Sequence, residues 1–137
     1  MKAFAAVLAL MVLACSSDPG LQTGPIVPNV VGDTARAELK LGQMLSLDGI
    51  TIRFVSVEED SRCPTDVTCV WEGNLSARLV ADGAGGERTI IVKTTTEPRE
   101  VEYGGWTISI GGVSPEKHSE RRIEEGEYTL RLVLARG

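Results

Sequence analysis

The 137-residue chain is poor in the residues from which most active sites are built. It has a single histidine, His118, and two residues each of Trp, Tyr and Phe. One histidine excludes metal sites that need several imidazoles. A Ser-His-Asp site would have to use His118 in a charged connection, and no G-x-S-x-G pattern is present. Carboxylates are too abundant to single out a glycosidase pair. We predict no enzymatic activity, no cofactor and no metal requirement.

Basic charge and long apolar runs are also scarce. The chain has 14 Lys and Arg residues against 19 Asp and Glu residues, and its formal net charge is −5. The adjacent pair Arg121 and Arg122 lies among five glutamates of residues 116–127. Binding to nucleic acid requires a basic surface, so we exclude nucleic acid as a partner. The apolar run of residues 3–13 is shorter than the roughly 20 residues that span a bilayer.

The same apolar run fits the hydrophobic region of a signal peptide. Lys2 precedes it, and it leads into the sequence Val-Leu-Ala-Cys at residues 12–15. An aliphatic residue three positions before a cysteine and a small residue directly before it resemble the lipobox of bacterial lipoproteins. The resemblance implies a diacylglyceryl group on the Cys15 thiol, cleavage before Cys15 and N-acylation of the new terminus. Residues 1–14 would then be the signal peptide; a secretory signal followed by a chance cysteine is the alternative.

Several acyl chains on one residue give stable anchoring to a membrane. Ser16 follows the cysteine, so the aspartate that retains lipoproteins at the inner membrane is missing from that position. We therefore expect the outer membrane in a bacterium with two membranes, and otherwise the outer side of the inner membrane. Residues 15–34 would be the lipidated cysteine and a flexible tether, because six prolines and glycines interrupt residues 16–34.

Residues 35–137 alternate between apolar and polar side chains in short segments separated by turns, which is typical of strands. Asp48-Gly49 predicts a hairpin turn, and the phase change at residues 55–57 predicts a bulge or a strand end. We find no helical period. The pattern predicts an all-β domain: a small antiparallel β-sandwich of seven or eight strands with Ig-like or Greek-key-like connections, with a barrel as the alternative. Strands are expected at 39–41, 45–47, 50–57, 70–81, 87–94, 106–110 and 128–134.

Two cysteines remain once Cys15 carries the lipid. Cys63 and Cys69 enclose five residues, which is not the C-x-x-C spacing of a zinc or redox site. In an oxidising compartment we expect them to form a disulfide, with α-carbons about 4.4–6.8 Å apart. The ring would hold a loop between two strands; surface recognition by that loop is the alternative.

The surrounding residues resemble a motif of small, uncharacterised secreted proteins and lipoproteins of bacteria. The resemblance implies the β-fold and the disulfide, and it transfers no activity. The residues that carry it are Asp60-Ser61-Arg62-Cys63-Pro64, Cys69-Val70-Trp71 and Gly73-Asn74, with Leu41-Gly42, Val113-Ser114-Pro115 and Tyr128 in the flanking strands.

The favoured hypothesis is a non-catalytic lipid-anchored module that binds an envelope protein or another envelope component. The candidate binding loop consists of Arg62, Pro64, Thr65, Asp66 and Trp71. We predict that Trp71 packs in the core, and an exposed Trp71 would be a binding anchor. One alternative is a protease inhibitor that presents residues 64–68. Another is a calcium-stabilised module, because five carboxylates cluster nearby (Glu58, Glu59, Asp60, Asp66 and Glu72), although an EF-hand spacing is missing.

The anchor is tested by replacing Cys15 with serine. The hydroxyl cannot take the place of the thiol that receives the diacylglyceryl group, so the variant should stay unprocessed or unanchored. Mass spectrometry of the mature N-terminus of the parent chain should find an acylated Cys15. An unmodified residue other than Cys15 at that terminus would contradict the lipoprotein assignment.

Overall fold

The computed structural model describes residues 24–137, and the predicted signal peptide and Cys15 lie outside this range. The described chain is all-β, with one short 3-10 helix, η1 (Glu125–Glu127). None of its helices is long and apolar enough to cross a membrane. The strands are β1 (Asn29–Val31), β2 (Thr34–Lys40), β3 (Met44–Leu47), β4 (Ile50–Asp60), β5 (Leu75–Asp82), β6 (Arg88–Lys93), β7 (Glu100–Tyr103), β8 (Trp106–Ser114) and β9 (Thr129–Arg136).

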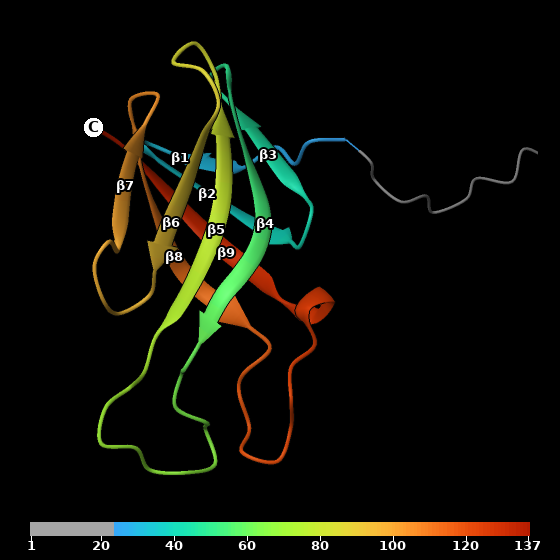
Figure 1. The fold of residues 1–137 in the computed structure, drawn as a ribbon. Helices are drawn as coiled ribbons and strands as arrows, with labels where there is room; N and C mark the ends of the chain where they lie inside the picture. Colours follow the sequence, from blue (N-terminus) through green and yellow to red (C-terminus); the bar gives the residue numbers. More distant parts are fainter. Residues whose placement is uncertain (1–23) are drawn as a thin grey trace, which may run out of the picture.

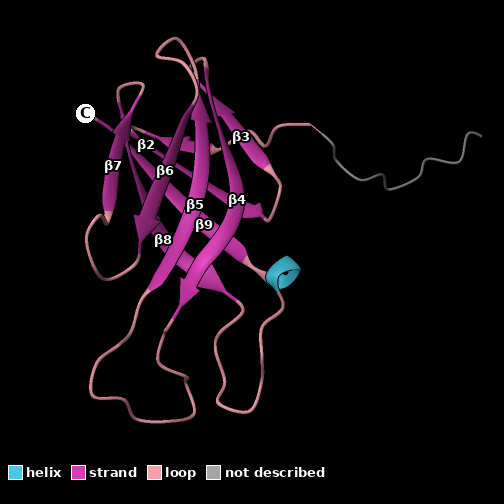
Figure 2. Ribbon diagram, viewed as in Figure 1, coloured by secondary structure: helices cyan, strands magenta, loops and turns pink. Residues whose placement is uncertain are grey.

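These strands form two antiparallel sheets that pack as a sandwich (Figures 1 and 2). One sheet has the order β1-β2-β9-β8-β7 and the other β3-β4-β5-β6. The sheets stay separate, which confirms the predicted sandwich. Residues 24–137 form nine strands, compared with the seven or eight predicted. β7 is one of the additional strands: Val101 and Tyr103 alternate with glutamates before a Gly104-Gly105 turn, a hairpin signal that was legible in the sequence.

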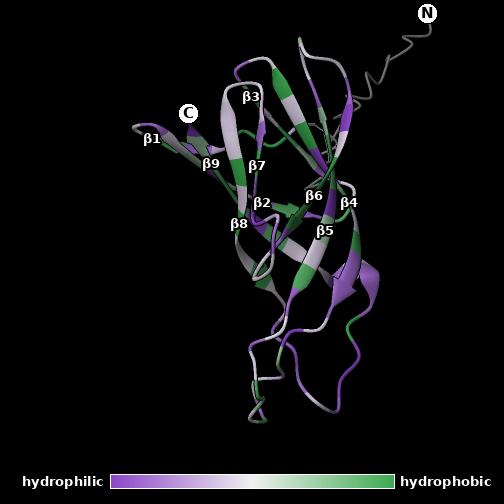
Figure 3. Cartoon of the chain, turned by 60° about the vertical axis from the view of Figure 1, so that its left-hand side comes forward, coloured by the Kyte–Doolittle hydropathy of each residue, from purple (hydrophilic) through white to green (hydrophobic). Residues whose placement is uncertain are grey.

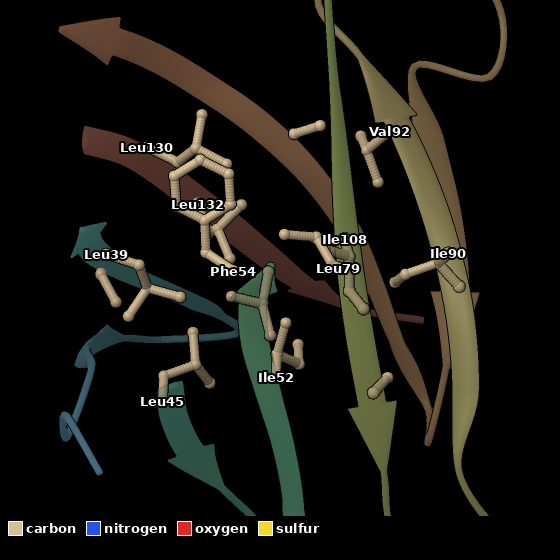
Figure 4. Packing of buried hydrophobic residues seen from close by; sticks show 14 of the residues in the cluster. Leu39, Leu45, Ile52, Phe54, Leu79, Ile90, Val92, Ile108, Leu130 and Leu132 are labelled. Atoms are coloured by element: carbon tan, nitrogen blue, oxygen red, sulfur yellow. The ribbon is translucent and has the colours of Figure 1, made fainter. Parts of the chain in front are cut away.

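The alternating apolar residues face inward and form one core. In β2, for example, Ala35, Ala37 and Leu39 are buried while their neighbours are exposed. Phe54 of β4 is fully buried and reaches toward Leu130 and Leu132 of the facing sheet (Figure 4). Side chains from both inner faces thus supply the hydrophobic stabilisation, as in other β-sandwiches.

The predicted irregularity in the long strand β4 is confirmed. Its pairing with β5 shifts register between Phe54 and Ser56, and again between Val57 and Glu59. Each shift is a bulge that bends the strand and increases its twist. After the second shift, β4 continues to Asp60, which lies opposite Leu75. β5 therefore begins at Leu75 and not at residue 70 as predicted, and residues 70–74 belong to the preceding loop.

Strand pairing also begins upstream of Ala35, inside the segment predicted as a tether. The Ile26 N–H donates to the Met44 carbonyl at 2.7 Å, and the Ser46 N–H donates to the Ile26 carbonyl at 3.0 Å. β1 then pairs with β2 in the other sheet. The β-branched residues here favour extended backbone despite the flanking prolines and glycines. Residues 26–31 thus join the two sheets.

Two long connections extend from the same end of the sandwich. The β4–β5 loop, residues 61–74, and the β8–β9 connection, residues 115–128, leave neighbouring strand ends and descend together in Figures 1 and 2. Hydrophilic residues predominate along both (Figure 3). We call this region the loop end, and it contains every candidate residue of the predicted binding loop.

Candidate functional site

Where the β4–β5 loop leaves the sheet, its two arms continue the backbone hydrogen bonding between β4 and β5. The Ser61 N–H donates to the Asn74 carbonyl at 2.7 Å, and the Cys63 N–H donates to the Glu72 carbonyl at 2.9 Å. The Ser61 hydroxyl adds contacts to the Asn74 backbone. The loop therefore projects on a paired stalk, and its tip lies between Cys63 and Glu72.

Gly73 and Asn74 fix the returning arm of this stalk. Gly73 has φ +75°, and a Cβ at this position would lie 1.9 Å from the Ser61 carbonyl oxygen, so no other residue fits without moving the backbone. The buried Asn74 side chain accepts hydrogen bonds from the N–H groups of Thr95 and Thr96 at 3.1 and 3.3 Å. The Asn74 side chain thus joins the loop to the β6–β7 connection.

Asp60 is the hub of the loop end. Its carboxylate accepts two parallel hydrogen bonds from Arg62, Nε to Oδ1 at 2.8 Å and Nη2 to Oδ2 at 2.9 Å. The Tyr128 hydroxyl donates to Oδ2 at 2.8 Å, and Lys117 Nζ donates to the Asp60 carbonyl at 2.8 Å. Arg62 also donates to the Pro115 carbonyl at 3.2 Å. One acidic residue therefore joins β4, its loop and both ends of the β8–β9 connection.

Burial and hydrogen bonding act in opposite directions on this hub. Partial burial of Asp60 works to raise its pKa, but the hydrogen bonds from Arg62 and Tyr128 outweigh burial, and the pKa lies below its ordinary value. Burial, together with donation to the Asp60 carboxylate, raises the pKa of Tyr128 to about 12. Asp60 is therefore charged and Tyr128 neutral at neutral pH, which is the pairing that the geometry requires.

The predicted disulfide between Cys63 and Cys69 is present, with α-carbons 6.0 Å apart. Inside the ring, Thr65 and Asp66 are bound to the neighbouring connection. The Thr65 N–H donates to the Lys117 carbonyl at 2.8 Å. The Ser119 N–H and hydroxyl donate to the Asp66 carboxylate at 2.9 and 2.5 Å. These bonds lower the pKa of Asp66. The two loops therefore form one unit.

Trp71 corrects the sequence-based prediction. It was expected in the core, but 55% of its surface is exposed, and Val70 beside it is fully exposed. Val67, inside the ring closed by the disulfide, is also exposed. The left-handed turn at Gly73 gives the reason, because it directs the chain back to the stalk only after Trp71. The exposed position is the one that the alternative interpretation requires, and the role of Trp71 as a binding anchor stays a prediction.

Four of the five carboxylates of the predicted acidic cluster have separate protein partners, and the fifth, Glu72, is exposed. Glu58 pairs with Arg78 at 2.8 Å, Glu59 accepts from the Ser61 hydroxyl, and Asp60 and Asp66 are bound as described above. Across residues 24–137, no three His, Cys, Asp or Glu side chains are grouped so that they could hold a metal ion. The convergence that a calcium module needs is therefore not seen in the described chain.

His118 lies at the surface of the same unit. Its Nδ1 is 3.3 Å from the Thr65 hydroxyl. Ser119 donates to Asp66 and not to the imidazole. The Ser, His and Asp side chains of the two loops are thus neighbours whose hydrogen bonds do not form the relay of a hydrolase.

Sequence reasoning named Arg62, Pro64, Thr65, Asp66 and Trp71 together, and the structure places all five on one loop. It missed Tyr128, Lys117 and the buried role of Asn74. Tyr128 carried a signal, because an isolated aromatic residue at the end of a polar connection often has its ring buried and its hydroxyl bonded.

From the contacts of Asp60 we predict that the substitution Asp60→Asn destabilises the folded domain. The side chain of Asp60 is only 10% exposed, so the amide would leave the Arg62 guanidinium without its counter-charge. Urea denaturation at pH 7 should show a loss of about 3 kcal/mol. The folded-state pKa is lowered, so the contribution of Asp60 is full above the unfolded value of 3.8 and is lost as the pH falls through the folded-state pKa. The difference between variant and parent should therefore shrink in acid.

Glu38→Gln is the matched control. Glu38 forms an exposed pair with Arg131 at 3.2 Å, and exposed pairs contribute little. This substitution should leave the urea midpoint unchanged. Equal effects of the two substitutions would contradict the role assigned to Asp60.

Removal of the disulfide should destabilise the domain less than Asp60→Asn does, and the two effects can be measured separately. Replacing Cys63 and Cys69 by alanine should lower the free energy of unfolding by about 2 kcal/mol, because a short closed ring removes little entropy from the unfolded chain. The circular dichroism spectrum should keep its β-form, since the core lies in the strands. Reduction of the parent chain should reproduce the loss and should not affect the variant. A further loss on reduction of the variant would refute this account.

No family model, curated protein or solved structure matches this chain. A role for the loop end is therefore inferred from its own geometry and charge.

Proposed function

We propose that the chain is a non-catalytic, lipid-anchored protein of the bacterial envelope that binds a protein partner through the tip of its disulfide loop. The observation that carries the proposal is the contrast between scaffold and tip. Arg62, Thr65 and Asp66 of the loop are bonded to the sandwich or to the neighbouring connection. Val67, Val70 and Trp71 are exposed to solvent. We call these three residues the apolar tip.

An apolar tip on a rigid stalk has the properties of a binding anchor. Tryptophan is enriched among residues that dominate interface energies, and a rim that excludes water strengthens its contribution. A loop held by a disulfide and by cross-loop hydrogen bonds loses little freedom on binding. Burial of this apolar area by a partner would stabilise the complex, whereas its exposure does not stabilise the isolated domain.

The charge around the tip indicates the chemistry of the partner. Acidic residues outnumber basic ones at the loop end, where exposed carboxylates include Asp66, Glu72, Glu116 and Glu120. A complementary surface has basic side chains around an apolar pocket, and this complementarity speeds encounter and disfavours other partners. Nucleic acid and anionic lipid would both be repelled by this end.

The inhibitor alternative receives less support from the geometry. Residues 64–68 form a turn, in which the Val67 N–H lies 3.3 Å from the Pro64 carbonyl. Thr65 and Asp66 are bound to the neighbouring connection. A segment presented to a protease cleft would need extended backbone with free hydrogen-bonding groups, as in strand-addition complexes.

The proposal predicts that the double variant Val70→Ser/Trp71→Ala loses its partner and keeps its fold. The full chain would be cross-linked in intact cells and recovered from the envelope. Loss of an anchor worth about 2 kcal/mol weakens binding roughly thirtyfold, which should remove the cross-linked species. Higher salt should weaken the parent complex as well, because acidic groups surround the tip.

Val55→Ser is the matched control, because Val55 is an exposed apolar residue on β4, outside the loop end. It should retain the cross-linked species. Thermal unfolding of all three proteins checks that the fold is intact. Equal recovery from the double variant and the control, or no partner for the parent chain, would refute recognition by the apolar tip.

A further inference from the structure

A second exposed apolar segment lies at the N-terminal edge of the domain. Of the seven large hydrophobic residues that are exposed in the described chain, three fall within five positions: Val27, Val30 and Val31, at 84%, 49% and 67% exposure. We call residues 27–31 the N-terminal edge. The sequence from Pro19 to Gly32 carries no charged side chain, so this edge is apolar and uncharged.

The N-terminal edge is fixed to the sandwich on both sides. Ile26 pairs with Leu45 of β3, and β1 pairs with β2. β1 is the outermost strand of its sheet, so one row of its backbone groups faces outward. Figure 3 shows β1 at the outer margin of the molecule. The edge is therefore a rigid, projecting surface.

The register places this edge opposite the loop end. β1 pairs with Thr34, Ala35 and Arg36 of β2, and these residues pair with Val133, Leu134 and Ala135 near the C-terminal end of β9. Tyr128, which binds the Asp60 hub, directly precedes the other end of β9. Figure 1 agrees, because β1 and the C-terminus lie away from the two long loops.

The length of chain between the edge and Cys15 limits their separation. Cys15 precedes Gly24 by nine residues, which span at most about 32 Å when fully extended. The connection is thus shorter than the predicted tether of residues 15–34, because residues 26–31 are incorporated into the sheets. A lipid on Cys15 would therefore hold Gly24, and the N-terminal edge that follows it, within this distance of the bilayer surface.

We infer that the N-terminal edge rests on the lipid bilayer and that the anchored domain is thereby oriented with its loop end outward. The inference relies on the lipid anchor of the proposed function. Val27, Val30 and Val31 supply apolar area for the headgroup boundary, and a lipid chain together with a second contact holds a protein more firmly than the chain alone. Exposed Arg36, opposite Asn29 in the register, supplies a cation at the level of the lipid phosphates.

The difference in charge between the N-terminal edge and the loop end supports this orientation. No carboxylate lies between Pro19 and Gly32, and Asp33 is the first one after the edge, whereas the loop end is rich in carboxylates. Anionic headgroups repel acidic segments within a Debye length of the surface. An anchored domain therefore has one end that tolerates the bilayer and one that avoids it, and the apolar tip is presented to partners away from the membrane.

Tryptophan fluorescence in brominated lipid tests the orientation. The lipidated full chain would be placed in vesicles of phosphatidylcholine with brominated acyl chains, as the parent and as the variant Val30→Trp. The indole introduced at position 30 should lose about half or more of its emission relative to unbrominated vesicles, because an indole at the headgroup boundary reaches the quencher. Val55→Trp, at an exposed position of the other sheet, should not be quenched.

Each other result overturns the inference. An unquenched indole at position 30 means that the edge stands off the bilayer. Quenching of the parent chain that disappears in Trp71→Phe, which leaves Trp106 as the remaining parent indole, means that the loop end inserts instead. A blue shift at position 30 without bromine quenching means that a second copy of the chain covers the edge. Val31→Trp guards against a local defect at position 30. Failure of the anchor itself is distinguishable, because mass spectrometry would find no acylated Cys15.

Discussion

The organisation of the loop end depends on the carboxylate of Asp60. Three donors from three parts of the chain converge on this residue: the Arg62 guanidinium, the Tyr128 hydroxyl and, at its carbonyl, the Lys117 ammonium. A nearly buried carboxylate is unfavourable unless such donors compensate for its lost hydration. Here the donors come from the β4–β5 loop and the β8–β9 connection. The same hydrogen bonds therefore compensate the charge and hold the two loops together.

The contacts of Asp60 help to explain why the apolar residues of the loop are exposed to solvent. Polar side chains that could have covered the tip are already bonded: Arg62 to Asp60 and Pro115, Asp66 to Ser119. Val70 and Trp71 lie in the short segment between the ring of Cys63 and Cys69 and the left-handed turn at Gly73, which packs closely against the Ser61 backbone. Their exposure is thus a consequence of the scaffold and not a local accident.

The local alternation of apolar and polar residues was sufficient to predict most strands of the sandwich. It was not sufficient to predict the contacts that connect distant segments of the chain. The alternation in Ile52 and Phe54 fixes which face is buried, because a strand has a period of two. The proline- and glycine-rich segment around Ile26 indicates a tether by composition, and only its pairing with a distant strand makes it part of the sheet. The contact between Asp60 and Tyr128 spans 68 positions, which no local pattern encodes. The exposure of Trp71 depends on how its loop is held by the hub, the disulfide and the left-handed turn at Gly73, which the sequence around Trp71 does not encode.

The two exposed apolar segments have different physical settings, and this difference separates their roles. The apolar tip is a compact point on a cross-linked stalk surrounded by carboxylates, a setting that suits a pocket of complementary charge. The N-terminal edge is a strand without charge, fixed directly after the connection to Cys15, a setting that suits an extended uncharged boundary. They lie beyond opposite ends of β9, so a domain held at one presents the other. The antiparallel return from β8 to β9 places the acidic connection of residues 115–128 beside the disulfide loop, so the carboxylates of both segments gather at the same end of the sandwich.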